Sequence, residues 1–213
     1  MVTLQAQGTN THNQLKYNNS NNIFSCYTSG QLDVCLFRRI EVYDYPAEQT
    51  ITLSSGWNWW STYLDIDLAQ LETALGNMAS NITSQSEGFR SYVNGIGWMG
   101  ELSHIHAAQM YKIQMVEGGT ITLNGMPVQA ADAQITLNPG DNWIGYPVAE
   151  SMSLSAAFAG AHPVNGDKVS SYDLYAQYYN GVWYGSLLNL EPGQGYIYKS
   201  NASQTKTFSF PVR

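Results

Sequence analysis

The sequence predicts a mainly β protein with minor helical content: two similar, small antiparallel β units in tandem, each with one short helix, after a β-hairpin leader. The first supporting observation is a repeat. Residues 51–59 read Ile-Thr-Leu-Ser-Ser-Gly-Trp-Asn-Trp and return 84 residues later, at 135–143, as Ile-Thr-Leu-Asn-Pro-Gly-Asp-Asn-Trp, with six of nine positions identical. Long-period repeats indicate a folding module copied in tandem. The second is composition, because 13% aromatic and only 12% charged residues argue against disorder.

Further matches at nearly the same offset extend the repeat almost to the end of the 213-residue chain. They include Trp98 with Trp183, Tyr111 with Tyr196, and Pro127 with Pro211. A chain of this length can bury substantial cores. We therefore divide it into a polar leader (1–49), a first module (50–128) and a second module (129–213).

The leader begins with Asn-, Gln-, Thr- and Ser-rich sequence over residues 1–23, which is typical of loop. Residues 24–43 predict a hairpin around a two-residue turn at Gly30 and Gln31. That turn would set Cys26 opposite Cys35, within reach of a disulfide, although the bond is geometrically demanding. Free, half-buried thiols are the alternative. Because an isolated hairpin is marginally stable, the leader is either the end of a preceding domain or an edge packed on the first module.

In the first module, a strand carrying Gly-x-Asn-Trp precedes a helix over residues 67–75. Leu68, Leu71 and Leu75 form one apolar stripe, with Asp67 as the N-cap and Gly76 as the stop. Strands are expected over 89–93, 110–116 and 119–124. Asn94-Gly95 lies after the first of these, and Asn-Gly favours a tight hairpin because both residues tolerate positive φ.

The second module repeats this order with a shorter helix over residues 153–159, in which Leu154, Ala157 and Phe158 face inward and Gly160 ends the helix. Strands are expected over 169–179, 195–199 and 206–210. Asn180-Gly181 matches Asn94-Gly95.

Charge excludes some partners. The net charge of −7 reflects a shortage of Lys and Arg, only nine in all, so the chain lacks the basic footprint of a nucleic-acid-binding protein. No apolar run reaches the length of a membrane span, so we expect no membrane insertion. The first residues lack the pattern of a signal peptide, and no C-terminal anchor follows the second module. If the protein is exported, we expect this chain to be part of a longer one.

The second module contains three motifs, Gly140-Asp-Asn-Trp, Trp183-Tyr-Gly-Ser-Leu and Leu190-Glu-Pro-Gly-Gln-Gly-Tyr-Ile-Tyr-Lys. In this order, and with a short helix after the first, they resemble a tandem module of secreted and cell-surface proteins of gut Bacteroidetes. The first copy departs at His106-Ala-Ala-Gln-Met-Tyr, so its turn there must be made differently. The resemblance covers about three quarters of the chain. It implies an extracellular or cell-surface location and an adhesin-type role as part of a larger protein, and it implies no active site.

No residue group predicts a catalytic, cofactor or metal site. Asp65 and Asp67 could share a strand face and serve a calcium or acid–base role, but the pair precedes a helix and Asp67 is expected to cap it. His104 and His106, with Glu101 nearby, could approach a zinc-binding arrangement, yet the second module has no matching histidines. Neither a nucleophile elbow nor a phosphate-binding loop is present.

Aromatic residues are the remaining candidates for binding. Those present in both modules (Trp59 with Trp143, Trp98 with Trp183, Tyr111 with Tyr196, Tyr92 with Tyr178) are predicted to be core. Those present in one module only are free to bind a ligand, and the candidates are Trp57, Trp60, Tyr63 and Tyr184. Trp57 and Trp60 point to opposite faces of a strand, so at most one of them faces a given site.

The sequence therefore favours a non-catalytic structural spacer or adhesin-type contact module of a larger bacterial surface protein, whose partner is another surface protein or a host or dietary glycan. A carbohydrate-binding module using exposed Trp and Tyr is the alternative, because flat rings stack on sugar faces while amides and carboxylates bind hydroxyls. A hydrolase fragment is a lesser alternative.

Overall fold

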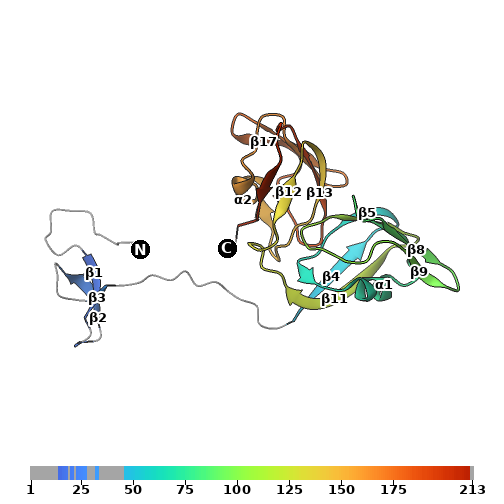
Figure 1. Cartoon of the computed structure of the whole chain (residues 1–213), viewed down its shortest axis with the longest axis horizontal. Helices are drawn as coiled ribbons and strands as arrows, with labels where there is room; N and C mark the ends of the chain where they lie inside the picture. The colour runs from blue at the N-terminus through green and yellow to red at the C-terminus, as the bar shows by residue number, and fades with distance from the viewer. Residues whose placement is uncertain (1–13, 19, 22, 28–31, 34–45, 212–213) are drawn as a thin grey trace. The chain divides into compact units, whose positions relative to one another are not determined.

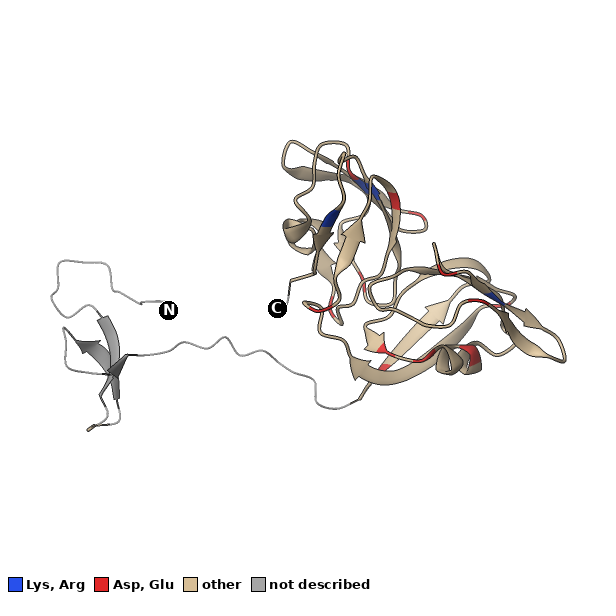
Figure 2. Cartoon of the chain, in the orientation of Figure 1, with Lys and Arg blue, Asp and Glu red and all other residues tan. Residues whose placement is uncertain are grey.

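The chain divides into two units, Met1–Glu41 and Val42–Arg213. The computed structural model describes residues 14–18, 20–21, 23–27 and 32–33 of the first unit and 46–211 of the second (Figure 1). None of the helices in these ranges has the length and the apolar composition of a membrane span. Figure 2 shows that Lys, Arg, Asp and Glu are few and scattered over residues 46–211.

The first unit contains a three-stranded sheet that differs from the predicted hairpin. Its strands are β1 (Gln14–Asn18), β2 (Ile23–Tyr27) and β3 (Leu32–Asp33), in the order β2-β1-β3. The prediction of loop up to residue 23 was wrong, because β1 pairs antiparallel with both other strands and lies between them. Cys26 belongs to β2 opposite Leu15, whereas Cys35 lies outside the described residues. The Cys26–Cys35 disulfide stays a prediction.

The first module contains two antiparallel sheets and one helix. A five-stranded sheet has the order β5-β10-β7-β8-β9, and a three-stranded sheet has the order β4-β11-β6. The elements are β4 (Ala47–Leu53), β5 (Gly56–Trp60), β6 (Leu64–Asp65), α1 (Leu68–Leu75), β7 (Ala79–Thr83), β8 (Phe89–Val93), β9 (Gly97–Gly100), β10 (Tyr111–Met115) and β11 (Gly119–Pro127).

The second module repeats this plan. Its five-stranded sheet, β13-β19-β15-β16-β17, is accompanied by the pairs β12-β20 and β14-β18. The elements are β12 (Ile135–Leu137), β13 (Gly140–Ile144), β14 (Met152–Ser153), α2 (Leu154–Ala157), the 3-10 helix η1 (Ala159–Ala161), β15 (Lys168–Ser170), β16 (Tyr175–Tyr179), β17 (Val182–Gly185), β18 (Asn189–Leu190), β19 (Tyr196–Ser200) and β20 (Lys206–Phe208). The predicted mainly β fold with antiparallel sheets and two short helices is confirmed.

Local signals explain several of these elements. Asp67 caps α1 by accepting a hydrogen bond from the Gln70 N–H, and the three predicted leucines are buried. Asn180 and Gly181 have φ values of 47° and 88° and form the two-residue turn between β16 and β17. The strand predicted over 169–179 is two strands, because a turn at 171–174 separates β15 from β16. The chain also continues past Gly160 into η1, so this glycine does not end the helical segment.

The Gly-x-Asn-Trp motif makes the same turn in both modules. Gly56 and Gly140 have φ values of 91° and 93°, which glycine adopts without strain. The side-chain amides of Asn58 and Asn142 then bridge the turn, each donating to two backbone carbonyls and accepting one backbone N–H. Asn142 also donates to the Tyr198 C=O at 3.1 Å. The glycine and the asparagine of the motif are thus explained by the turn itself.

Each module has its own hydrophobic core. The first core extends from Leu53 to Leu123 and the second from Ile135 to Phe210. The two aromatic positions placed correctly in the core are Tyr111 and Tyr196, both fully buried. Trp98 and Trp183 are half-buried and pack on the cores from outside. The core prediction was wrong for Trp59 and Trp143, for reasons given below, and also for Tyr92 and Tyr178, which are half-buried and belong to neither core.

Candidate functional site: an aromatic cleft where the modules meet

Backbone hydrogen bonds join the two modules in a pseudo-two-fold arrangement. One set runs from the end of β5 to the turn before β19, and the other runs from the end of β13 to the turn before β10. The bonds are Ser61 N–H to Gly193 C=O (3.2 Å), Gly195 N–H to Trp59 C=O (3.0 Å), Gly145 N–H to Ala108 C=O (2.9 Å) and Met110 N–H to Trp143 C=O (3.5 Å). Because donors and acceptors occupy equivalent repeat positions in both sets, each module presents the same surface to the other, as the subunits of a two-fold dimer do.

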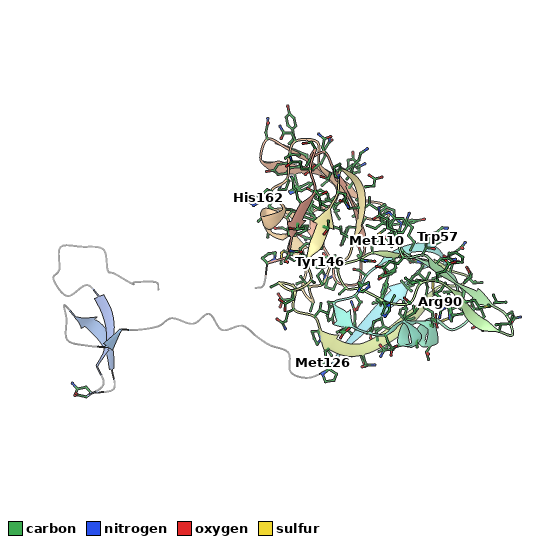
Figure 3. All side chains as sticks on the ribbon, viewed as in Figure 1. Trp57, Arg90, Met110, Met126, Tyr146 and His162 are labelled. Atoms are coloured by element: carbon green, nitrogen blue, oxygen red, sulfur yellow. The ribbon has the colours of Figure 1, made fainter. Side chains whose placement is uncertain are left out.

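The symmetry of this junction is broken at its centre. Met110 and Gly195 occupy equivalent positions and lie against one another, since a Cβ on Gly195 would fall 2.1 Å from Met110 Cγ. Met110 is fully buried yet belongs to neither core, and Figure 3 labels it where the modules meet. A large side chain on one module therefore fills the space that a glycine leaves on the other.

A second asymmetry involves Ser61. Its Oγ donates to the Gln194 C=O at 2.6 Å and accepts from the Tyr146 N–H at 3.1 Å, and Ser61 is fully buried. Its counterpart is Gly145, where a Cβ would fall 2.2 Å from the Ala107 C=O. Close backbone approach thus requires glycine at this position of the second module.

Beside this junction lies a cleft of about 480 Å³ with an aromatic wall. Trp57 and Trp59, two residues apart on β5, come from the first module, whereas Tyr172 comes from the turn between β15 and β16 of the second. Trp57 is 41% exposed and Tyr172 is 62% exposed. The Tyr172 ring meets the Trp59 ring edge-on at a centroid distance of 6.0 Å. Polar side chains complete the lining, among them Thr50, Thr52, Ser54, Asp173 and Gln194.

The pseudo-two-fold relation generates a counterpart cleft of about 440 Å³. Its lining contains Trp143, equivalent to Trp59, and Gln85 at the position of Tyr172. The repeat counterpart of Trp57 is Asp141, which does not line this cleft. The Gln85 side chain donates to the Asp141 C=O at 2.8 Å and accepts from the Trp143 N–H at 2.7 Å. In this cleft a side-chain amide therefore covers the backbone edge of β13.

Lys112 lies between the two repeat tryptophans. Its Nζ is 4.1 Å from the Trp143 ring centroid and 5.4 Å from that of Trp59. Both rings are half-buried. The core prediction was wrong for them because they lie at the junction of the modules and not inside either core. Partial burial lowers the pKa of Lys112, and the adjacent ring faces stabilise its positive charge.

The predicted ligand residues fall in four different environments. Trp57 lies in the aromatic cleft. Trp60 is fully buried in the first core, so its ring has no surface for a ligand, and we leave it out of the site. Tyr63 is half-buried against the same core, with its hydroxyl 3.4 Å from the Glu48 C=O. Tyr184 is exposed on β17 and does not line the cleft.

Sequence reasoning missed Trp59 and Tyr172. Trp59 was assigned to the core because both modules carry a tryptophan there. Tyr172 is in a turn, where periodicity gives no information. The one available signal was that Tyr172 has no aromatic counterpart in the first module.

Three of the residues considered for metal or acid–base chemistry, Asp67, His104 and His106, have other contacts. Asp67 caps α1. His104 and His106 stack at a centroid distance of 6.1 Å, and His106 Nε2 is 3.7 Å from a Glu87 carboxylate oxygen. Within the described part of the chain, no group of three or more His, Cys, Asp or Glu side chains could hold a metal ion.

Comparisons with known proteins found no matching family model, no matching curated protein and no matching solved structure.

Proposed function

We propose that this chain is a non-catalytic, carbohydrate-binding part of a larger bacterial surface or secreted protein, and that the aromatic cleft is its binding site. The observation that carries the proposal is the combination of Trp57, Trp59 and Tyr172 with hydroxyl, amide and carboxylate groups in one open cleft. Aromatic rings provide apolar faces for the C–H side of a sugar, while the polar groups can bind its hydroxyls. Only 12% of the residues are charged, and this small fraction of charged residues fits a neutral ligand.

Trp57 is the residue best suited to contact the sugar. It is exposed, and its repeat counterpart in the second module is Asp141 instead of an aromatic residue. Its neighbour Trp60 supports the core, so ligand contact and folding are assigned to different side chains of one strand. Trp57→Ala should therefore remove binding while leaving the fold intact.

The test is a glycan array probed with the whole chain, with Trp57→Ala, and with Tyr179→Ala as a matched control. Tyr179 is 57% exposed on β16 and does not line the cleft. We expect a saturable glycan signal that Trp57→Ala loses and Tyr179→Ala keeps. A blank array with folded wild-type protein, or a signal unaffected by Trp57→Ala, would contradict the proposal.

A second candidate function is protein contact by the outer hairpins. Tyr175, Tyr179 and Tyr184 are 52–58% exposed and share one face of β16–β17 by register. The equivalent β8–β9 hairpin exposes Phe89 and Met99. Exposed apolar patches of this kind mark contact surfaces, as an adhesin-type module needs. Loss of surface-protein binding in Tyr179→Ala, with glycan binding retained, would support this function.

A further inference from the structure

The backbone edge of β5 in the aromatic cleft matches the edge that Gln85 covers in the counterpart cleft. In antiparallel strands, the N–H and C=O of one residue point to the same side. The Trp59 C=O accepts from Gly195, not from β10, so the Trp59 N–H also points away from β10. The same holds for Trp57, two residues earlier. Neither the Trp59 N–H nor the Trp57 C=O has a hydrogen-bond partner among the described residues.

Gln85 and Tyr172 are equivalent residues. Each follows a serine whose Oγ accepts the backbone N–H three residues later: Ser84 from Glu87, and Ser171 from Leu174. Each also reaches the repeat tryptophan of the other module. Gln85 bonds to the edge of β13, whereas Tyr172 meets Trp59 through its ring only. The donor–acceptor pair on β5 is therefore left for another molecule.

We propose that this pair, the Trp57 C=O and the Trp59 N–H, binds two adjacent hydroxyl groups of a sugar, as the Gln85 side-chain amide binds the equivalent pair on β13. A hydroxyl both donates and accepts, so one can donate to Trp57 while its neighbour accepts from Trp59. The ring carrying this diol would lie between Trp57 and Tyr172. This inference rests on the proposed function, and it specifies which backbone atoms form hydrogen bonds with the sugar.

The length of the open edge favours a small group over an added peptide strand. On one side, the bridge between Trp60 and Gln194 already occupies the edge of β5. On the other side, β5 begins at the turn residue Gly56. Only the Trp57–Trp59 step lies between, and strand addition uses a run of main-chain bonds.

The test is an NMR titration of the full chain with methyl β-D-glucopyranoside, methyl β-D-galactopyranoside, methyl α-D-mannopyranoside and methyl β-D-xylopyranoside. We expect at least one glycoside to shift the backbone amide signal of Trp59 saturably. The backbone amide of Trp143 is the internal control, because Gln85 already occupies it, and its signal should not move.

Two variants sharpen the test. Tyr172→Gln should place an amide on the β5 edge as Gln85 does on β13, and should weaken glycoside binding at least tenfold. Gln85→Ala should leave the Trp59 response unchanged and make the Trp143 amide responsive.

A glycoside that shifts the indole signals of Trp57 and Trp59 but not the Trp59 backbone amide would overturn the diol contact while leaving carbohydrate binding intact. No response to any glycoside or to the glycan array would mean that the proposed function itself fails.

Discussion

Neighbouring residues of β5 serve opposite purposes because side chains alternate along a strand. Trp57 and Trp59 face the cleft, and Trp60 faces the core, where it is fully buried. The same alternation gives Trp143 at the junction and Ile144 in the second core. Position along the strand, more than residue type, decides which tryptophan can meet a ligand.

This alternation predicts different stabilities for two tryptophan variants. Trp60→Ala should lower the free energy of unfolding by about 3–5 kcal/mol, because it leaves a large cavity in the first core. Trp57→Ala should change it by less than about 1 kcal/mol, since its ring is exposed. Urea unfolding followed by far-UV circular dichroism measures both. Equal losses in the two variants would mean that the faces of β5 are assigned wrongly.

Repetition alone could not distinguish core residues from junction residues. Trp59 and Trp143 are present in both modules, and so are the fully buried Tyr111 and Tyr196. A pseudo-two-fold junction requires the same residue in both copies just as a shared core does. Whether a repeated residue belongs to a core or to the junction is decided by how the two modules pack against each other. The same packing brings Tyr172 of the second module to Trp59 of the first.

The turn preceding β5 and β13 depends on one asparagine in each module. Asn142 is buried and its side-chain nitrogen has three carbonyl partners, whereas that of the less buried Asn58 has two. An aspartate at either position cannot donate and would set a negative charge among carbonyl oxygens.

We therefore expect Asn142→Asp to destabilise the protein more than Asn58→Asp. The loss should be about 2–4 kcal/mol for Asn142→Asp, because a buried hydrogen-bond network loses its donor. Thermal unfolding at neutral pH measures the two variants side by side. An equal or reversed ranking would contradict the role assigned to the Tyr198 contact.

Short elements were predictable where local chemistry decides them. The cap of α1 and the Asn180-Gly181 turn follow from residues adjacent in sequence. The strand β1 was missed because its Asn- and Gln-rich sequence is typical of loop. The order β2-β1-β3 was missed because strand pairing is not encoded in the turn residues alone.

The docking of the two modules can be tested at Gly145. A Cβ there would fall within 3 Å of backbone atoms of Ala107 and Gln109, so Gly145→Ala should destabilise the protein by about 1–3 kcal/mol. Gly160→Ala is the control, because the nearest atom to its Cβ would be 3.7 Å away. Calorimetric unfolding should show a lowered or divided transition for Gly145→Ala only. Unchanged unfolding would mean that the junction contributes little to stability.

The second unit should also lose stability at alkaline pH. Burial raises the pKa of Tyr111, Tyr196 and Tyr198 above the ordinary value of 10.0, and for Tyr198 a hydrogen bond to Asp167 raises it further. Above pH 10 the unfolded chain releases these protons while the native state keeps them. The unfolded state then binds fewer protons, so stability falls with rising pH, by about 1.4 kcal/mol per pH unit for each tyrosine.

Unfolding free energies measured between pH 9 and about 11.5 check the alkaline prediction. Stability should be nearly constant up to about pH 10, since model tyrosines ionise there, and should then decline steeply. Tyr198→Phe should reduce the slope above that pH. A flat profile would show that the three hydroxyls ionise freely in the native protein.

Isothermal titration calorimetry tests the central claim most directly, with the oligosaccharide that gives the strongest array signal as titrant. Because the β13 edge of the counterpart cleft is covered by Gln85, we predict one binding site per chain. Trp57→Ala should remove the heat of binding, while Tyr179→Ala should bind as wild type does. Two equivalent sites, or unchanged binding by Trp57→Ala, would contradict the assignment of the aromatic cleft as the binding site.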